Sequence, residues 1–383
     1  MVDAEQMGRD IGDPAIAALF TRRFVEASER FDGLVDAAAW QILGALGALP
    51  PEGGHHLDEA AAGLGLAPAA AGVFSFLHRK LADAGFLSGE GGHFAPTGKA
   101  PAAFPDLAAA FAASEPDAAV GAEIVGLLVA EAGAFFSGEK SGEEILFSPI
   151  RLPLWFRYFS NANLLYGINN ALGAEVLARH LPAKGATVLE VGGGAGSAAE
   201  EALRRAGPRI GRYRFTEVVP TFLRRGERAA RAAAAAAGAG AEVEAFKLDM
   251  THRWEEQGVP PGSLDAVYSV NCFHVAPDLG AVLAEALRAL KPGGFLAVSE
   301  CLKPGDPFRP IYVDFVFEFL TSFTNVATDP VKRPTHGFLT PAAWKASLES
   351  AGFTGVVVEP DVERLGRSYR NFFVGAVTAR RPG

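Results

Sequence analysis

Hydrophobic positions in the first part of the chain recur at helical spacing. Apolar side chains fall on one predicted helical face at Ile16, Leu19, Phe20 and Phe24, which indicates an N-terminal helical arm. From Ala37 a three-helix pattern follows, with its second helix at 57–64 and its third at about 69–85. A tight glycine-rich hairpin then ends near Phe94. Three helices followed by a hairpin are the order of a winged helix.

The next segments are also predicted to be helical. Residues 104–136 are rich in alanine and apolar throughout, and residues 152–179 form a long pattern that carries several aromatic side chains. Between them lies the looser segment 137–142, which contains glycine and serine and is predicted to be a hinge. We therefore expect a mostly helical domain over 1–150.

Short apolar runs that alternate with helices fill the chain from residue 186 almost to its end. The seven predicted strands are 188–191, 213–216, 243–248, 264–270, 295–299, 354–358 and 372–379. Helical segments such as the alanine-rich 229–237 separate most of them, which is typical of a doubly wound sheet. The predicted fold class is therefore α/β, with a Rossmann-like seven-stranded sheet in a domain over 151–383. The linker helix 151–180 begins that domain.

Composition and charge narrow the range of partners. The chain has 383 residues, of which 49% are hydrophobic, and a formal net charge of -9, so we expect a folded protein. It lacks the concentrated basic face that nucleic-acid binding needs. No secretory segment or long uncharged apolar run is evident, so we expect a cytoplasmic location and no membrane partner. The two cysteines, Cys272 and Cys301, are too far apart for a close-spaced metal pair, and no metal site is expected.

The strongest chemical signature lies in residues 188–197. An apolar strand brings Glu190 to its end, and Gly192, Gly194 and Gly196 follow at alternate positions. Glycine allows the backbone to turn sharply and to approach a ligand closely. A dinucleotide-binding turn has similar spacing, but an acid at Glu190 would repel a pyrophosphate. The same acid can hold the ammonium group of a methionine moiety, so the expected cofactor is S-adenosylmethionine.

Acidic residues after the next two strands complete the predicted cofactor site. Glu217 suits the two ribose hydroxyls, and Asp249 suits the amino group of adenine while Met250 packs on the ring face. Asn271, at the end of the fourth strand, is assigned to the same site. A nicotinamide-dependent dehydrogenase is the alternative, because an acid after the second strand would fit a dinucleotide too.

These motifs resemble those of class I methyltransferases. Residues 188–197 are similar to the first motif of that family, and 291–296 resemble its "LKPGG" turn before the fifth strand. The resemblance runs from about residue 186 to the end and implies a methyltransferase that depends on S-adenosylmethionine. The preceding part is similar to the winged-helix-like dimerisation domain of plant-type small-molecule O-methyltransferases. That second resemblance implies a homodimer.

Two kinds of relative compete within the catalytic half. Residues 249–250 and 299–302 resemble segments of the O-methyltransferases, whereas 214–223 and 271–274 are similar to the methyltransferase domains of polyketide synthases. We expect methyl transfer to an oxygen of a small, largely apolar natural product, either free or carrier-tethered. Carbon methylation of a polyketide-type β-keto acceptor is the alternative. A winged-helix regulator that senses S-adenosylmethionine is the alternative outside the enzymes.

His274 and Glu300 are the predicted catalytic pair. His274 lies just beyond the fourth strand and Glu300 just after the fifth, and these strands are neighbours in this type of sheet. A neutral imidazole near pH 7 can take a proton from the acceptor, so His274 is the expected general base. The carboxylate of Glu300 would fix the imidazole tautomer and stabilise the imidazolium.

Overall fold

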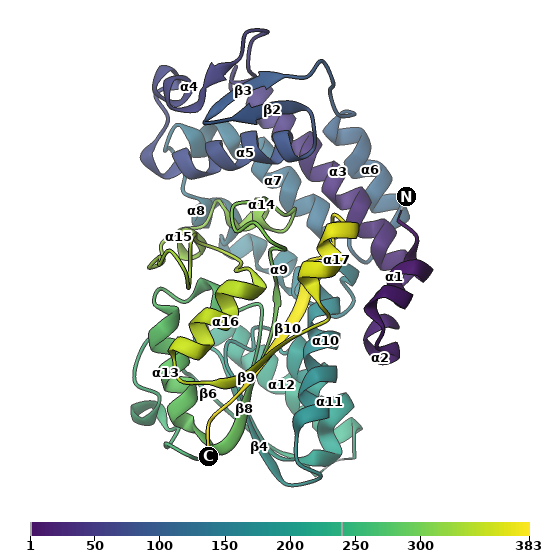
Figure 1. Cartoon of the computed structure of the whole chain (residues 1–383), viewed down its shortest axis with the longest axis vertical. Helices are drawn as coiled ribbons and strands as arrows, with labels where there is room; N and C mark the ends of the chain where they lie inside the picture. Colours follow the sequence, from purple (N-terminus) through teal and green to yellow (C-terminus); the bar gives the residue numbers. More distant parts are fainter. Residues whose placement is uncertain (1, 239) are drawn as a thin grey trace. The chain divides into compact units, whose positions relative to one another are not determined.

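The computed structural model describes residues 2–238 and 240–383, and its contacts divide the chain into two compact units (Figure 1). The sheet unit comprises Met1–Arg22, Phe159–Pro307 and Asn325–Gly383. The helical unit comprises Arg23–Tyr158 and Phe308–Thr324. Each unit is assembled from separate stretches of chain, so this division differs from the contiguous one expected at residue 150.

A seven-stranded sheet forms the centre of the sheet unit and matches the seven predicted strands. Its strands are β4 (Ala186–Glu190), β5 (Ile210–Thr216), β6 (Glu242–Phe246), β7 (Leu264–Val270), β8 (Leu290–Cys301), β9 (Thr354–Glu359) and β10 (Val374–Arg380). The order is β6-β5-β4-β7-β8-β10-β9, with the first five parallel and β10 antiparallel to both of its neighbours. The order reverses between β4 and β7, and ligands of open α/β sheets bind at such a switch point.

Helices cover both sides of this sheet (Figure 1). On one side lie α10 (Leu164–His180) and α11 (Ser197–Ala206), and on the other lie α13 (Leu279–Ala289) and α16 (Pro341–Ser350). Helix α12 (Pro220–Ala236) packs beside α11. Because both faces are covered, the central strands β4 and β7 are buried along most of their length. The predicted α/β fold class is confirmed.

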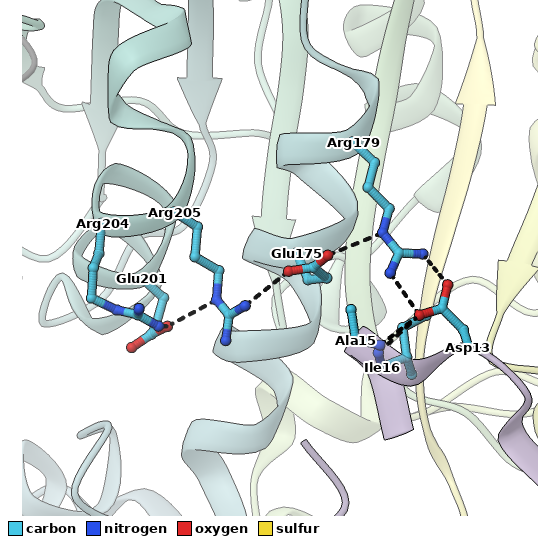
Figure 2. A network of polar contacts seen from close by, with 8 residues as sticks. All are labelled: Asp13, Ala15, Ile16, Glu175, Arg179, Glu201, Arg204 and Arg205. Atoms are coloured by element: carbon cyan, nitrogen blue, oxygen red, sulfur yellow. Dashed lines mark hydrogen bonds and ion pairs between the residues drawn. The ribbon is translucent and has the colours of Figure 1, made fainter. Parts of the chain in front are cut away.

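A chain of ion pairs connects the N-terminal arm to the rest of the sheet unit (Figure 2). The arm breaks into α1 (Ala4–Ile11) and α2 (Pro14–Ala17), and α17 (Val362–Ser368) packs against α1. The ion pairs run through Asp13, Arg179, Glu175, Arg205 and Glu201. Two hydrogen bonds from Arg179, at 2.7 and 2.9 Å, hold the pKa of Asp13 down at about 2. These contacts join the first residues to α10 and α11.

The helical unit begins with the expected succession of helices and a hairpin. Its first elements are α3 (Arg22–Ala45), β1 (His55–His56), α4 (Leu57–Leu64), α5 (Ala71–Asp83), β2 (Leu87–Glu90) and β3 (His93–Pro96). The three strands pair in the order β1-β3-β2. Strand β1 was not predicted, because its two histidines lie in a glycine-flanked segment that reads as a loop. The winged-helix character of this arrangement stays a prediction.

The two segments predicted to be helical, 104–136 and 152–179, each contain more than one helix in the structure. The remaining helices are α6 (Phe104–Ser114), α7 (Ala119–Phe136), α8 (Gly142–Leu146), α9 (Leu152–Tyr158), α14 (Asp314–Phe317) and α15 (Thr321–Thr324). The predicted helical segment 104–136 consists of α6 and α7, which Pro116 separates. The single helix over 152–179 was wrong because α10 begins after Asn163, whose backbone is extended.

Helix α7 is long and apolar enough to cross a membrane by length and composition alone. Half of it is buried inside the protein, as in the core helix of a soluble domain, so this feature is weak evidence for a membrane span.

Candidate active site

The carboxyl-terminal edge of the parallel strands carries most of the predicted site residues. Glu190 ends β4, Glu217 follows β5 and Asn271 follows β7. Glu300 lies inside β8, so its predicted position just after the strand was wrong. The reason is that β10 pairs with β8 as far as Cys301 and extends the strand. Since parallel strands end at one edge, these side chains share that edge of the sheet.

Glu190 is a buried carboxylate with one unused oxygen. It is 1% exposed, and its Oε2 accepts a hydrogen bond from the hydroxyl of Tyr213 at 2.8 Å. Within residues 2–238 and 240–383, its Oε1 has no hydrogen-bond partner. Burial and the nearby charge of Glu217 raise the pKa of Glu190 to about 8, against the opposing effect of the Tyr213 bond. A buried acceptor of this kind favours a ligand that brings a positively charged donor.

The loop after β4 approaches neighbouring atoms so closely that glycine is required. Gly192 has φ +69°, and a Cβ there would lie 2.2 Å from Sγ of Cys272. Gly196 has φ +94°, and a Cβ there would lie 2.8 Å from the Cα of Gly226. Between them, the N–H of Gly194 donates to Oε2 of Glu217 at 2.9 Å. The predicted strand, glycine loop and helix are all present, since α11 begins directly after Gly196.

The other predicted cofactor residues are partnered differently. Oε1 of Glu217 accepts the N–H of Val219 at 2.8 Å, and each oxygen of this carboxylate keeps a second lone pair. Oδ1 of Asp249 accepts from the hydroxyl and the N–H of Thr251, at 2.7 and 3.0 Å, and these bonds lower the pKa of Asp249. Met250 is half-buried beside it. Glu217 therefore joins the glycine loop, whereas Asp249 is engaged with its own turn.

Asn271 has a strained backbone at the end of β7. Its φ is +47°, and among the described residues no other non-glycine residue has a positive φ. For an L-residue this conformation costs about 1 kcal/mol. The N–H of Asn271 donates to the carbonyl of Ser299 at 2.9 Å, while its Oδ1 is buried and has no partner within the described chain. Strain and an unused acceptor together are typical of a functional site.

His274 and Glu300 form a buried hydrogen-bonded pair. The distance from Nδ1 of His274 to Oε2 of Glu300 is 2.7 Å, and Glu300 is fully buried. Oε1 of Glu300 accepts the backbone N–H groups of Cys272 at 3.1 Å and of His274 at 3.4 Å. Nδ1 is therefore the ring nitrogen that faces the carboxylate, and Nε2 is the nitrogen that a general base in this orientation would use. The pair has the geometry of an oriented general base.

Three residues near these groups were not predicted as site residues. The hydroxyl of Tyr166 is hydrogen-bonded to Ser197, and burial together with the charges of Glu190 and other nearby groups raises its pKa. Tyr213 partners Glu190, and Arg333 donates to the backbone carbonyl of His274. Only Tyr166 had a sequence signal, as one of the aromatic residues of the helical segment predicted over 152–179. In the part of the chain that is described, no group of three or more His, Cys, Asp or Glu residues is arranged to hold a metal ion.

Comparisons with known proteins identify a methyltransferase domain in this chain. Residues 189–296 match the family described as "Methyltransferase domain". The chain is 31% identical over 208 residues to lovastatin diketide synthase lovF of Aspergillus terreus, and 30% identical over 199 residues to reducing polyketide synthase Preu2 of Preussia isomera. These matches cover 53% and 50% of this chain but only 8% of each synthase, so the chain corresponds to a small part of either protein.

Solved structures share the fold over almost the whole chain. The CurJ carbon methyltransferase superposes with a TM-score of 0.78 and 21% identity, and the match covers 100% of both chains. The citrinin polyketide synthase CMeT domain superposes with a TM-score of 0.74 and 16% identity, over 99% of this chain and 95% of that one. The chain therefore contains a class I, S-adenosylmethionine-dependent methyltransferase domain that resembles the methyltransferase domains of polyketide synthases.

Proposed function

We propose that the protein transfers a methyl group to the activated carbon of a polyketide-type β-keto acceptor. The main support for methylation on carbon is the similarity of the whole chain to a solved carbon methyltransferase, with a TM-score of 0.78. The matched polyketide synthases support the same class of acceptor. The comparisons thus favour the carbon alternative over the oxygen acceptor expected from the sequence.

We infer that the cofactor lies along the ends of β4, β5, β6 and β7. The unused Oε1 of Glu190 fits the ammonium of the methionine moiety, and the loop of Gly192, Gly194 and Gly196 allows close approach of the chain. Glu217 would take the ribose hydroxyls. Asp249 and Met250 would contact adenine, and Asn271 would offer its buried Oδ1. When bound, S-adenosylmethionine supplies the methyl group, and its sulfur keeps the electron pair of the bond that breaks.

His274 acts as the general base in this proposal. Its Nε2 takes one proton from the carbon between the two carbonyl groups of the acceptor, and the electron pair of that C–H bond stays on the acceptor. The pair is shared with the neighbouring carbonyl group until the carbon forms its new bond to the methyl group. Glu300 holds Nδ1 at 2.7 Å and stabilises the imidazolium that results.

Three broader expectations belong to the same proposal. The acceptor is a small molecule, either free or tethered to a carrier. The protein acts in the cytoplasm. The helical unit mediates a homodimer through its winged-helix-like part. Light scattering at micromolar concentration would test the dimer, since a monomer would remove that expectation.

Product analysis with a defined acceptor tests the proposal. The protein is incubated with S-adenosylmethionine and the N-acetylcysteamine thioester of acetoacetate, which is a small β-keto thioester. We expect mass spectrometry to detect a singly methylated product, and NMR to locate the methyl group on the carbon between the carbonyls. A methyl group found only on the enol oxygen would refute the carbon assignment and restore the oxygen acceptor.

A further inference from the structure

Arg333 is a buried arginine of the sheet unit that belongs to none of the methyltransferase motifs. It lies in the segment before α16 and is 2% exposed. Its backbone is fixed in a tight turn, because Asp329 and Arg333 exchange N–H···O=C bonds at 2.8 and 3.0 Å. Oδ1 of Asp329 also accepts the N–H groups of Val331 and Lys332. These bonds fix the backbone from which the side chain of Arg333 extends.

The guanidinium group is bonded to the backbone of the segment that bears the proposed base. Nη2 of Arg333 donates to the carbonyl of His274, and Nη1 donates to the carbonyl of Ala276. In the same segment, the backbone N–H groups of Cys272 and His274 donate to Oε1 of Glu300. The backbone carbonyls of this short turn thus accept hydrogen bonds from the buried Arg333, and its backbone N–H groups donate to the buried Glu300.

Other groups from the same segment hold the same turn. The N–H of Ala327 donates to the carbonyl of Pro277 at 2.7 Å. The ring of Phe338 lies 4.3 Å from the imidazole of His274, centroid to centroid, at an interplanar angle of 38°. The backbone and the ring of His274 are therefore both fixed from this side.

The charge of Arg333 persists in this buried place. Burial lowers the pKa of its guanidinium to about 10, while the charges of Glu300 and Asp278 oppose that decrease. At neutral pH the group stays protonated and offsets the buried carboxylate of Glu300. Removal of Arg333 would leave two backbone carbonyls without their donor and Glu300 without this compensating charge.

We propose that Arg333 is a positioning residue for methyl transfer, which fixes the backbone of His274 so that Nε2 is directed at the acceptor carbon. It acts through His274 and Glu300 and does not itself touch the acceptor. The inference rests on the proposed role of His274 as the base. A displacement of about 1 Å in a catalytic group can lower the rate of reaction up to a hundredfold.

The test compares three variants of the whole chain. Arg333→Met removes both donor nitrogens. Arg333→Lys keeps a positive charge but has one donor nitrogen in place of Nη1 and Nη2. Arg214→Met is the matched control. Arg214 is also a buried arginine of the sheet unit, 8% exposed, and it donates to the carbonyl of Gly258 at 2.8 Å. Turnover is measured as S-adenosylhomocysteine formed with the acetoacetyl thioester. It is divided by the number of S-adenosylhomocysteine-binding sites, counted by calorimetry, so unfolded protein does not contribute.

We expect Arg333→Met to lower kcat per binding site by about tenfold or more, with KM for the thioester and Kd for S-adenosylhomocysteine nearly unchanged. Arg333→Lys should lose only about threefold, because its ammonium restores part of the contact. Arg214→Met should lower Tm and leave kcat per site unchanged. In a His274→Ala background, Arg333→Met should have almost no further effect, because both changes act on one proton transfer.

An unchanged kcat per site in Arg333→Met would overturn the proposal, and so would an equal further loss in the His274→Ala background. If Arg333→Met yields no protein that binds S-adenosylhomocysteine, Arg333→Lys decides, and wild-type turnover in that variant would refute the proposal. Because total methyl transfer is scored, methylation on oxygen would refute the carbon acceptor and leave this comparison valid. Full activity of His274→Ala alone would overturn both the proposed base and the role of Arg333.

Discussion

Glu190 and Glu300 are buried carboxylates near the carboxyl ends of the parallel strands β4 and β8, and their hydrogen bonding differs. Glu190 has one hydrogen bond, from Tyr213, and its Oε1 has no partner within the described residues. Glu300 accepts from two backbone N–H groups and from the ring of His274, so both of its oxygens are used.

This difference separates a site that needs a ligand from a site that is already complete. A buried acceptor left unsatisfied costs about 1–3 kcal/mol, and a ligand with a cationic donor relieves that cost. For Glu190 the cost is expressed as a pKa raised to about 8, so the free protein keeps a proton there at neutral pH. Glu300 needs no ligand, and its bonds fix the position of His274 before any acceptor arrives.

The largest expected effect is a loss of kcat on replacing His274, which is hydrogen-bonded to Glu300. His274→Ala should lower kcat by about a hundredfold or more, because general base catalysis is lost while the rest of the site stays intact. The affinity for S-adenosylhomocysteine should stay close to that of the wild type. Steady-state kinetics with the acetoacetyl thioester and calorimetry provide the two measurements. A variant that keeps nearly full activity would show that positioning alone supports methyl transfer.

Replacing each glutamate with glutamine should distinguish a role in cofactor binding, for Glu190, from a role in catalysis, for Glu300. Glu190→Gln removes the charge but keeps the size of the side chain, and the affinity for S-adenosylhomocysteine should fall about tenfold to a hundredfold. Glu300→Gln should leave that affinity unchanged and lower kcat about tenfold, because a neutral amide stabilises the imidazolium less well. Calorimetry and kinetics on both variants test the contrast.

Each glutamine variant is the control for the other. The double variant His274→Ala with Glu300→Gln should be far less impaired than the product of its single losses, since both groups serve one proton transfer. If Glu300→Gln lowered cofactor affinity as much as Glu190→Gln does, the division between an incomplete and a complete site would be wrong.

The strands and the glycine loop could be predicted because their causes are local. A parallel strand covered on both faces must be apolar, as at Val188 and Leu189, and short apolar runs between helices reveal it. A close backbone approach requires glycine, as at Gly192 and Gly196. Glu190 and Glu300 could be predicted because each lies in or beside such a segment.

The contacts that sequence could not reveal join distant segments. Arg333 donates to carbonyls 57 and 59 residues away along the chain, and a bond to a backbone carbonyl needs no complementary side chain that a pattern could show. The break before α10 was missed for a different reason. Its polar residues, Asn161 among them, equally fit the solvated face of a continuous helix, yet in the structure Asn161 donates to the carbonyl of Ser197.

The smallest expected effect is the pH dependence of cofactor binding. The pKa of Glu190 in the free protein is raised to about 8, and a bound ammonium group favours the ionised carboxylate. Below that pH the ligand must displace a proton, so affinity for S-adenosylhomocysteine should rise about fivefold between about pH 7 and pH 8 and level off above that range. Calorimetry near pH 7, in two buffers that differ in ionisation enthalpy, should detect the released proton.

The raised pKa of Glu190 also predicts how the stability of the free protein changes with pH. The pKa of Glu190 in the folded free protein is raised from the usual 4.5 to about 8, so its contribution to the free energy of unfolding is fully present below about pH 4.5 and is lost as the pH rises from there through about 8. S-adenosylhomocysteine should therefore raise Tm more at the upper end of that range than at the lower end. Glu190→Gln cannot ionise and should bind with little dependence on pH. If the wild type bound equally well across this range, or released no proton, the ammonium of the ligand would have to be held by a group other than Glu190.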